Sequence, residues 1–265
     1  MIPVLLYHAV SDHPRPGLGR WTVSTDAFDR HCHFIAECGR TPMTVSQYAG
    51  ALRAGSPSED TIVITFDDGY ADTFAACRRL AAGIGAATVY VTTSWIGQPG
   101  MLREQDLIVL AALGVEIGAH SHTHRRLDEL AGPDLENDIV TSRRHLTGRT
   151  GAPVASFAYP HGNYDRRTRA AVAEAGFNSA CAVRNALSHA ADDTLAIARL
   201  TVAASTSDAR LRSWLDGDGP PAPGGELLRT RAWRSARRIR ARVLQSPPAL
   251  PPPAPAVVRV AGDPR

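Results

Sequence analysis

Residues 61–70 read T-I-V-I-T-F-D-D-G-Y, and this stretch decides the fold. The first part, Thr61 to Phe66, is apolar or β-branched without polar alternation, which predicts a strand buried on both faces of a parallel α/β sheet or barrel. Asp67 and Asp68 follow at once, and Gly69 lets the backbone turn sharply. Because ligands bind at the carboxyl ends of such strands, a functional site is expected at the two carboxylates.

The aspartate pair itself needs an explanation. Two like charges side by side at a buried strand end repel each other unless they share a proton or a cation. An Asp-Gly turn that caps a helix is common after any strand, and it would explain one of the two aspartates but not both. A metal site therefore explains the pair better.

A second group of candidate ligands lies in residues 114–124, which read G-V-E-I-G-A-H-S-H-T-H. Residues 115–119 predict a short strand, and the histidines follow it. His120 and His124 would share a face if the segment coils helically, whereas His120 and His122 would share one if it stays extended. A carboxylate with two imidazoles and an open position for water is the ligand set of a catalytic rather than a structural zinc site.

The motifs T-F-D-D-G-Y and H-S-x-x-H resemble the first two motifs of the NodB-type polysaccharide deacetylases, carbohydrate esterase family 4. The resemblance extends over roughly residues 1–205. It implies a distorted (β/α) barrel that removes N-acetyl or O-acetyl groups with the help of a divalent metal. It also implies that Asp67 is the catalytic base and Asp68 a metal ligand. His120 and His124 are then the other two ligands.

A Tyr-His pair ends the first predicted strand, M-I-P-V-L-L-Y-H. A histidine bonded within a loop is the simplest interpretation of His8. In the branch that resembles the poly-N-acetylglucosamine deacetylases, however, the motifs are circularly permuted, and a Tyr-His on the first strand supplies the general acid. The late Leu-x-His motif of other members is absent from the last predicted strand, Ala196 to Val202. The resemblance therefore implies that His8 is the general acid.

Residues 156–162, S-F-A-Y-P-H-G, resemble the third family motif, R-x-P-Y-G, with two departures. Ala158 stands where the family has arginine, and His161 stands where it has tyrosine. The arginine that orients the catalytic aspartate is therefore expected elsewhere, and Arg199 on the last predicted strand is the candidate. The backbone N–H of His161 is expected to donate to the oxyanion.

The composition suits one barrel-sized domain with a C-terminal extension. The chain has 265 residues, 44% of them hydrophobic, which is enough for a core. We expect a catalytic domain over residues 1–215, a Gly/Pro linker over 216–225, and a basic helix with a Pro-rich tail over 226–265. The last segment has nine arginines against two acidic residues, or +7. Because the whole chain is +3, residues 1–225 carry −4.

The arginines of residues 226–245 predict either a solvated face packed on the barrel or a weak association with an anionic membrane. No stretch is as long and apolar as a membrane span, and the N-terminus has no signal-like segment. The four cysteines show no paired metal spacing. The expected location is the cytoplasm, and a peripheral association with the inner membrane face is left open. No nucleic-acid partner is expected, and the oligomeric state is left open.

The expected reaction is the removal of an N-acetyl group from an N-acetylated amino sugar, with release of acetate. The ligand set suits Zn²⁺, although Co²⁺, Ni²⁺ or Mn²⁺ would also accept it. One alternative is an amidase on the same barrel that acts on a non-sugar N-acyl or ureide substrate. Another is a catalytically inactive carbohydrate-binding homologue. Asp67 argues against inactivity, because a purely structural metal site has no use for a second carboxylate.

Overall fold

The computed structural model describes residues 1–221. The predicted basic helix and Pro-rich tail over 226–265, and the last part of the linker, lie outside the described residues. The strands are β1 (Val4–Tyr7), β2 (Ala9–Val10), β3 (Thr22–Val23), β4 (Thr41–Met43), β5 (Thr61–Phe66), β6 (Thr88–Val91), β7 (Glu116–Ala119), β8 (Ser156–Ala158), β9 (Ser179–Cys181) and β10 (Leu200–Thr201).

The α-helices are α1 (Thr25–Glu37), α2 (Val45–Arg53), α3 (Thr73–Gly83), α4 (Glu104–Ala112), α5 (Gly132–Thr150), α6 (Arg166–Glu174) and α7 (Asp208–Leu215). Three short 3₁₀ helices are η1 (Gly19–Trp21), η2 (Leu127–Glu129) and η3 (Pro160–Gly162). None of the helices within residues 1–221 is both long and apolar enough to cross a membrane.

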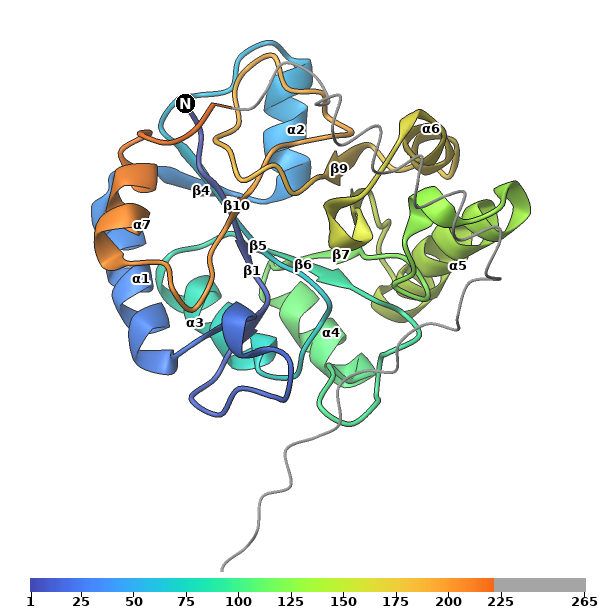
Figure 1. Ribbon diagram of the computed structural model, residues 1–265, viewed down its shortest axis with the longest axis horizontal. Helices are drawn as coiled ribbons and strands as arrows, with labels where there is room; N and C mark the ends of the chain where they lie inside the picture. Colours follow the sequence, from blue (N-terminus) through green and yellow to red (C-terminus); the bar gives the residue numbers. More distant parts are fainter. Residues whose placement is uncertain (222–265) are drawn as a thin grey trace, which may run out of the picture.

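Apart from β2 and β3, which form a separate two-stranded parallel sheet, the strands form a curved parallel sheet with helices around it (Figure 1). They pair in the order β10-β1-β5-β6-β7-β8-β9, and β4 pairs with the first half of β5. Every residue of β5 is buried, as the unbroken apolar run predicts. The expected distorted (β/α) barrel is therefore confirmed within the described residues.

The register of the strands brings their carboxyl ends to one edge. Tyr7 of β1 pairs with Phe66 of β5, so His8 and Asp67 leave the sheet at the same level. Val91 of β6 pairs with Ala119 of β7, which His120 follows. Residues that are far apart in the sequence therefore converge at this edge.

The last strand is shorter than the sequence predicts. An extended segment was expected from Ala196 to Val202, but β10 holds only Leu200–Thr201, which pairs with β1. Just before β10, Ile197 forms a parallel bridge with Cys181 of β9. The irregular segment thus joins both ends of the sheet, and it directs Arg199 into the interior, where its side chain is fully buried.

Helix α2 closes the end of the barrel opposite the site. Its first turn is bound to the amino ends of two strands. The Val45 N–H donates to Thr88 Oγ1 at 3.0 Å, and the Ser46 N–H donates to Glu116 at 3.1 Å. Its apolar face packs into a core cluster with the inward side chains of the sheet, including Tyr90. Helix α2 therefore fills the end of the barrel at which the strands begin, opposite their carboxyl ends.

Two local features are not predicted from the sequence. The cap of α1 is Ser24, which accepts a hydrogen bond from the Ala27 N–H. Thr25, the first residue of α1, bonds to Asp12. Residues 216–221, assigned to the linker, contact the body, because the Leu187 N–H donates to the Pro220 carbonyl at 2.9 Å.

Candidate active site

Both aspartates face the same point because the backbone changes direction between them. Successive side chains of a strand point to opposite faces, so Asp67 and Asp68 would diverge if β5 continued. Asp68 instead has φ of 75°, in the left-handed region that non-glycine residues seldom adopt, and Gly69 has φ of 83°. Such conformations cost free energy and cluster at functional sites. As a result, both carboxylates lie near the same atom, His120 Nε2. This nitrogen is 3.9 Å from Asp67 Oδ2 and 3.3 Å from Asp68 Oδ1.

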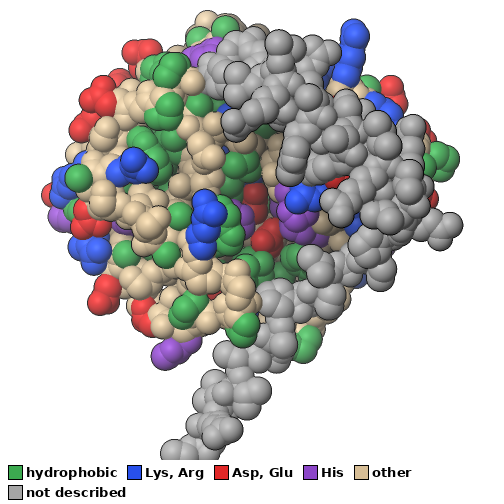
Figure 2. All heavy atoms as spheres, viewed as in Figure 1, with side chains coloured by type: hydrophobic (Ala, Val, Ile, Leu, Met, Phe, Trp, Pro, Cys, Tyr) green, Lys and Arg blue, Asp and Glu red, His purple; other side chains and the backbone are tan. Residues whose placement is uncertain are grey.

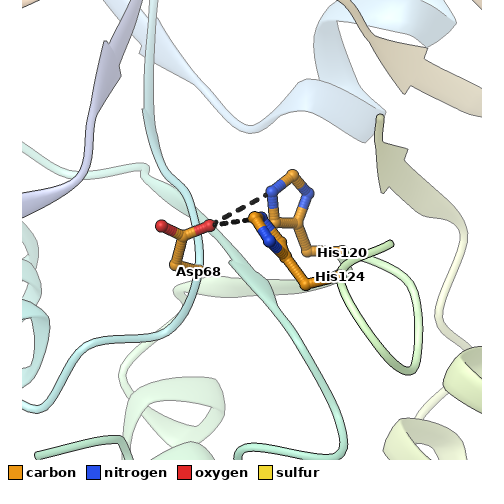
Figure 3. Close-up of side chains that lie close together, drawn as sticks. All are labelled: Asp68, His120 and His124. Atoms are coloured by element: carbon orange, nitrogen blue, oxygen red, sulfur yellow. Dashed lines mark ion pairs between the residues drawn. The ribbon is translucent and has the colours of Figure 1, made fainter. Parts of the chain in front are cut away.

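Asp68, His120 and His124 come together as a possible ligand set (Figure 3). The Nε2 atoms of His120 and His124 lie 3.3 Å and 3.0 Å from the same oxygen, Asp68 Oδ1. One ligand atom from each residue lies within 4.8 Å of the other two. In the space-filling view, carboxylate and histidine side chains line the bottom of a hollow on this face (Figure 2).

The hydrogen bonding of His120 fits a metal ligand. Its Nδ1 lies 2.8 Å from the Ala158 carbonyl oxygen, which can only accept, so the proton of the neutral ring is on Nδ1. Nε2 then presents a lone pair to the carboxylate of Asp68, an unfavourable contact unless a proton or a cation lies between them. Burial lowers the pKa of His120, but Asp67 and Asp68 raise it more, and the net pKa is raised. Either a proton or a metal cation would satisfy this arrangement.

The conformation of the turn after β7 decides which two histidines face the carboxylates, a question that the sequence leaves open. Ser121 and His124 have φ of 62° and 58°, and the His124 N–H bonds to Ser121 Oγ at 2.9 Å. This turn brings His124 beside Asp68. The side chain of His122 lies elsewhere, with Nδ1 at 2.8 Å from Thr93 Oγ1. The pair that faces the carboxylates is therefore His120 and His124.

Arg199 binds the carboxylate of Asp67 in a bidentate manner. Both guanidinium–carboxylate distances are 2.7 Å, and both side chains are buried. Arg199 also donates to Thr65 Oγ1 at 3.1 Å and to the Ala182 carbonyl at 3.2 Å. Burial raises the pKa of Asp67, but Arg199, His120 and His8 lower it, and the net pKa is lowered. Asp67 is therefore held ionised and in a fixed orientation.

His8 lies across the site from the histidine pair. Its Nδ1 is buried and has no hydrogen-bond partner within residues 1–221. Burial lowers the pKa of His8, whereas Asp68 and Asp67 oppose this effect, and the net pKa is lowered. The ring centroid lies 5.3 Å from that of Trp21 in η1, so an aromatic side chain stands beside His8 at the edge of the site.

His161 lies against His124, with ring centroids 4.6 Å apart. Burial, with a contribution from His124, lowers the pKa of His161 to about 3, so its ring is neutral. The residue has φ of 59° within η3. Among the described residues, no acceptor is found for its backbone N–H. The side chain thus packs against the possible ligand set while the N–H remains available.

Sequence reasoning did not find Asp138, which binds the turn between the two candidate histidine ligands, or Trp21, which contacts His8. Asp138 accepts hydrogen bonds from the backbone N–H groups of His122 and Thr123. One signal was present: in α5 the buried positions include Leu135, Asp138 and Ile139, so a carboxylate occupies the inner, apolar face. Trp21 follows an irregular loop whose path no local pattern predicts.

Comparison with known proteins agrees with the fold. Residues 54–180 match the family model described as polysaccharide deacetylase. The Bacillus subtilis protein YxkH, whose name assigns it provisionally to the polysaccharide deacetylases, is 25% identical over 178 residues. That match covers 66% of this chain and 62% of YxkH, so the chain spans less than two thirds of this relative.

Solved structures show the same architecture. The Streptococcus pyogenes deacetylase PplD, in complex with acetate, superposes with a TM-score of 0.73 at 21% identity, over 79% of this chain and 96% of that one. IcaB from Ammonifex degensii gives a TM-score of 0.72 at 19% identity, over 81% and 97%. A polysaccharide deacetylase from Bacillus cereus gives 0.72 at 22% identity, over 81% and 68%. At these identities the likeness establishes the fold.

Proposed function

We propose that the protein is a metal-dependent deacetylase that removes the N-acetyl group of an N-acetylated amino sugar and releases acetate. The observation that carries this proposal is the arrangement of two adjacent carboxylates with different partners. Asp67 is bound by Arg199, whereas Asp68 faces His120 and His124. One group is thus held as a base, and the other is part of a ligand set. The family match over residues 54–180 supports the same reaction class.

Asp68, His120 and His124 would hold a divalent cation, and Zn²⁺ suits these ligands best. A bound cation of this kind polarises a carbonyl oxygen and lowers the pKa of water toward neutrality. Asp67 accepts the proton of the attacking water, and Arg199 keeps its carboxylate ionised and oriented. The burial of Asp67, which is 2% exposed, excludes competing solvent from this base.

His8 and His161 act on the other atoms of the amide. The free N–H of His161 donates to the carbonyl oxygen as negative charge develops there. His8 protonates the departing amine, which is too basic to leave as an anion. Its lowered pKa makes the protonated ring a stronger acid, although less of it is present at neutral pH. Asp67, His161, His8 and the proposed cation site thus provide a group for each step of the hydrolysis.

The experiment separates the two aspartates. Asp67→Asn is expected to keep its metal and lose most turnover, because the amide cannot accept the proton. Asp68→Ala is expected to lose both. Metal content is measured by mass spectrometry and turnover by acetate release from N-acetylglucosamine and its short oligomers. An Asp67→Asn protein that turns over normally would overturn the assignment.

The substrate class is tested with the same assay. Non-sugar N-acyl amines and a ureide are included beside the N-acetyl sugars. Release of acetate from the sugars alone supports the proposal. Hydrolysis confined to the non-sugar compounds would instead identify an amidase on the same barrel, and a protein that binds sugars without hydrolysing any would be an inactive homologue.

A further inference from the structure

Asp138 is a buried carboxylate outside the set of proposed catalytic residues. It lies on α5 with 5% of its surface exposed, between the buried positions Leu135 and Ile139. A carboxylate buried on an apolar face is unfavourable unless its oxygens receive hydrogen bonds. The partners of Asp138 therefore indicate why it is present.

Among residues 1–221, all of the hydrogen-bond partners of Asp138 belong to the turn that follows β7. Oδ1 accepts from the His122 N–H at 2.6 Å and from the Thr123 N–H at 3.3 Å. Oδ2 accepts from the Thr123 hydroxyl. One side chain thus binds two successive peptide groups and a hydroxyl between the two proposed histidine ligands.

The two histidines depend on this turn to different degrees. His120 directly follows β7, its N–H donates to the Val91 carbonyl at 3.0 Å, and its ring is fixed by the Ala158 carbonyl. Within residues 1–221, His124 has no such backbone bond to a strand, and it reaches Asp68 through a turn with left-handed residues at both ends, Ser121 and His124. These conformations cost free energy and persist where surrounding contacts impose them.

We propose that Asp138 is a positioning residue for the metal site: by binding the backbone at His122 and Thr123, it places the imidazole of His124 against Asp68 and thereby sets the affinity for the cation. This inference rests on the metal site of the proposed function. The carboxylate does not touch the cation itself. It acts by holding the turn in the conformation in which three ligands converge, so that little ordering remains to be done on binding.

The experiment measures the affinity of the full chain for Zn²⁺ by competition with a chromogenic chelator, without substrate. Asp138→Ala is expected to raise the Kd for Zn²⁺ about 10- to 100-fold, the usual effect of removing a residue that orients a metal ligand. Asp138→Asn keeps the side-chain volume and one acceptor oxygen, so it is expected to fold and to lose less affinity. Thr123→Val removes only the hydroxyl contact and is expected to have the smallest effect.

Glu136→Ala is the matched control, because it removes a carboxylate from the exposed face of the same helix. Thermal unfolding of each metal-free variant separates the two possible roles. A residue that supports only the fold would lower the melting temperature and leave the Kd of the folded protein unchanged. A Kd for Asp138→Ala and Asp138→Asn within twofold of Glu136→Ala would overturn the inference.

The outcome is distinguishable from failure of the metal site itself. If Asp68→Ala and His120→Ala still bind Zn²⁺ as tightly as the parent chain, the proposed site is wrong. If those two variants lose Zn²⁺ and Asp138→Ala does not, only the positioning role fails. A failed search for the sugar substrate would affect neither measurement.

Discussion

Arg199→Met tests the buried ion pair on which the proposed chemistry depends. The change keeps an apolar side chain of similar length but removes both 2.7 Å contacts to Asp67. Breaking a buried ion pair by removing one partner costs about 3–5 kcal/mol, because the remaining charge is left without compensation. For a domain of this size each kcal/mol lowers the melting temperature by about 2–4 °C, so the expected loss is about 6–20 °C.

The loss of stability caused by Arg199→Met is expected to depend on pH. In the parent protein the net pKa of Asp67 is lowered, so the ionised carboxylate stabilises the folded state. This contribution is present above the unfolded pKa of about 3.9 and is lost as pH falls through the lower folded pKa. Without Arg199, burial raises the pKa of Asp67, and the ionised form becomes destabilising. The stability difference between variant and parent should therefore be larger at pH 7 than at pH 5.

Calorimetry or denaturant unfolding at both pH values, with chelator present, measures this difference. Arg30→Met is the control, because it breaks an equally direct contact, 2.8 Å to Asp208, at the exposed surface, where solvent screens the pair. Arg30→Met should change stability far less. A loss for Arg199→Met below about 1 kcal/mol, or the same loss at pH 5 and pH 7, would refute the reasoning.

Three further predictions concern the ligand turn, the acid and the tail. His124→Ala should strip the metal, whereas His122→Ala should spare it; equal metal loss in both, measured by mass spectrometry, would contradict the ligand assignment. His8→Ala should keep metal affinity and lower the turnover of amides about 10²- to 10⁴-fold. The loss should be smaller for an O-acetyl substrate, because its leaving alcohol needs less protonation. Unchanged turnover of amides would remove His8 from the mechanism. A chain cut after Gly225 should keep activity on a small soluble N-acetyl sugar and bind anionic vesicles less at low salt; loss of metal or folding would argue against a membrane role for 226–265.

The sequence predicts the strands that carry the chemistry because their signals are local. Thr61 to Phe66 reads as buried on both faces whatever surrounds it, and β5 has those bounds. The expectations for Asp67 and Asp68 followed from their place at the end of that strand. The barrel was expected because T-F-D-D-G-Y and H-S-x-x-H resemble the motifs of the NodB-type deacetylases.

The resemblance to the third family motif implied an orienting arginine. Because Ala158 stands at the motif's arginine position, Arg199 was the candidate. The contact between Arg199 and Asp67 joins residues that are 132 apart in the chain. No local pattern encodes it, because it depends on the irregular segment that links β9 to β10 and directs this side chain into the barrel.

What only the tertiary structure decided is the conformation of turns. Periodicity cannot tell whether the residues after β7 coil or stay extended, since both patterns are compatible with H-S-H-T-H. The answer lies in contacts from other elements: Asp138 on α5 binds the turn from one side, and the Ser94 N–H donates to the His122 carbonyl at 3.0 Å from the other. A short turn takes its shape from the hydrogen bonds that neighbouring elements offer, and those neighbours are brought to it only when the whole chain folds.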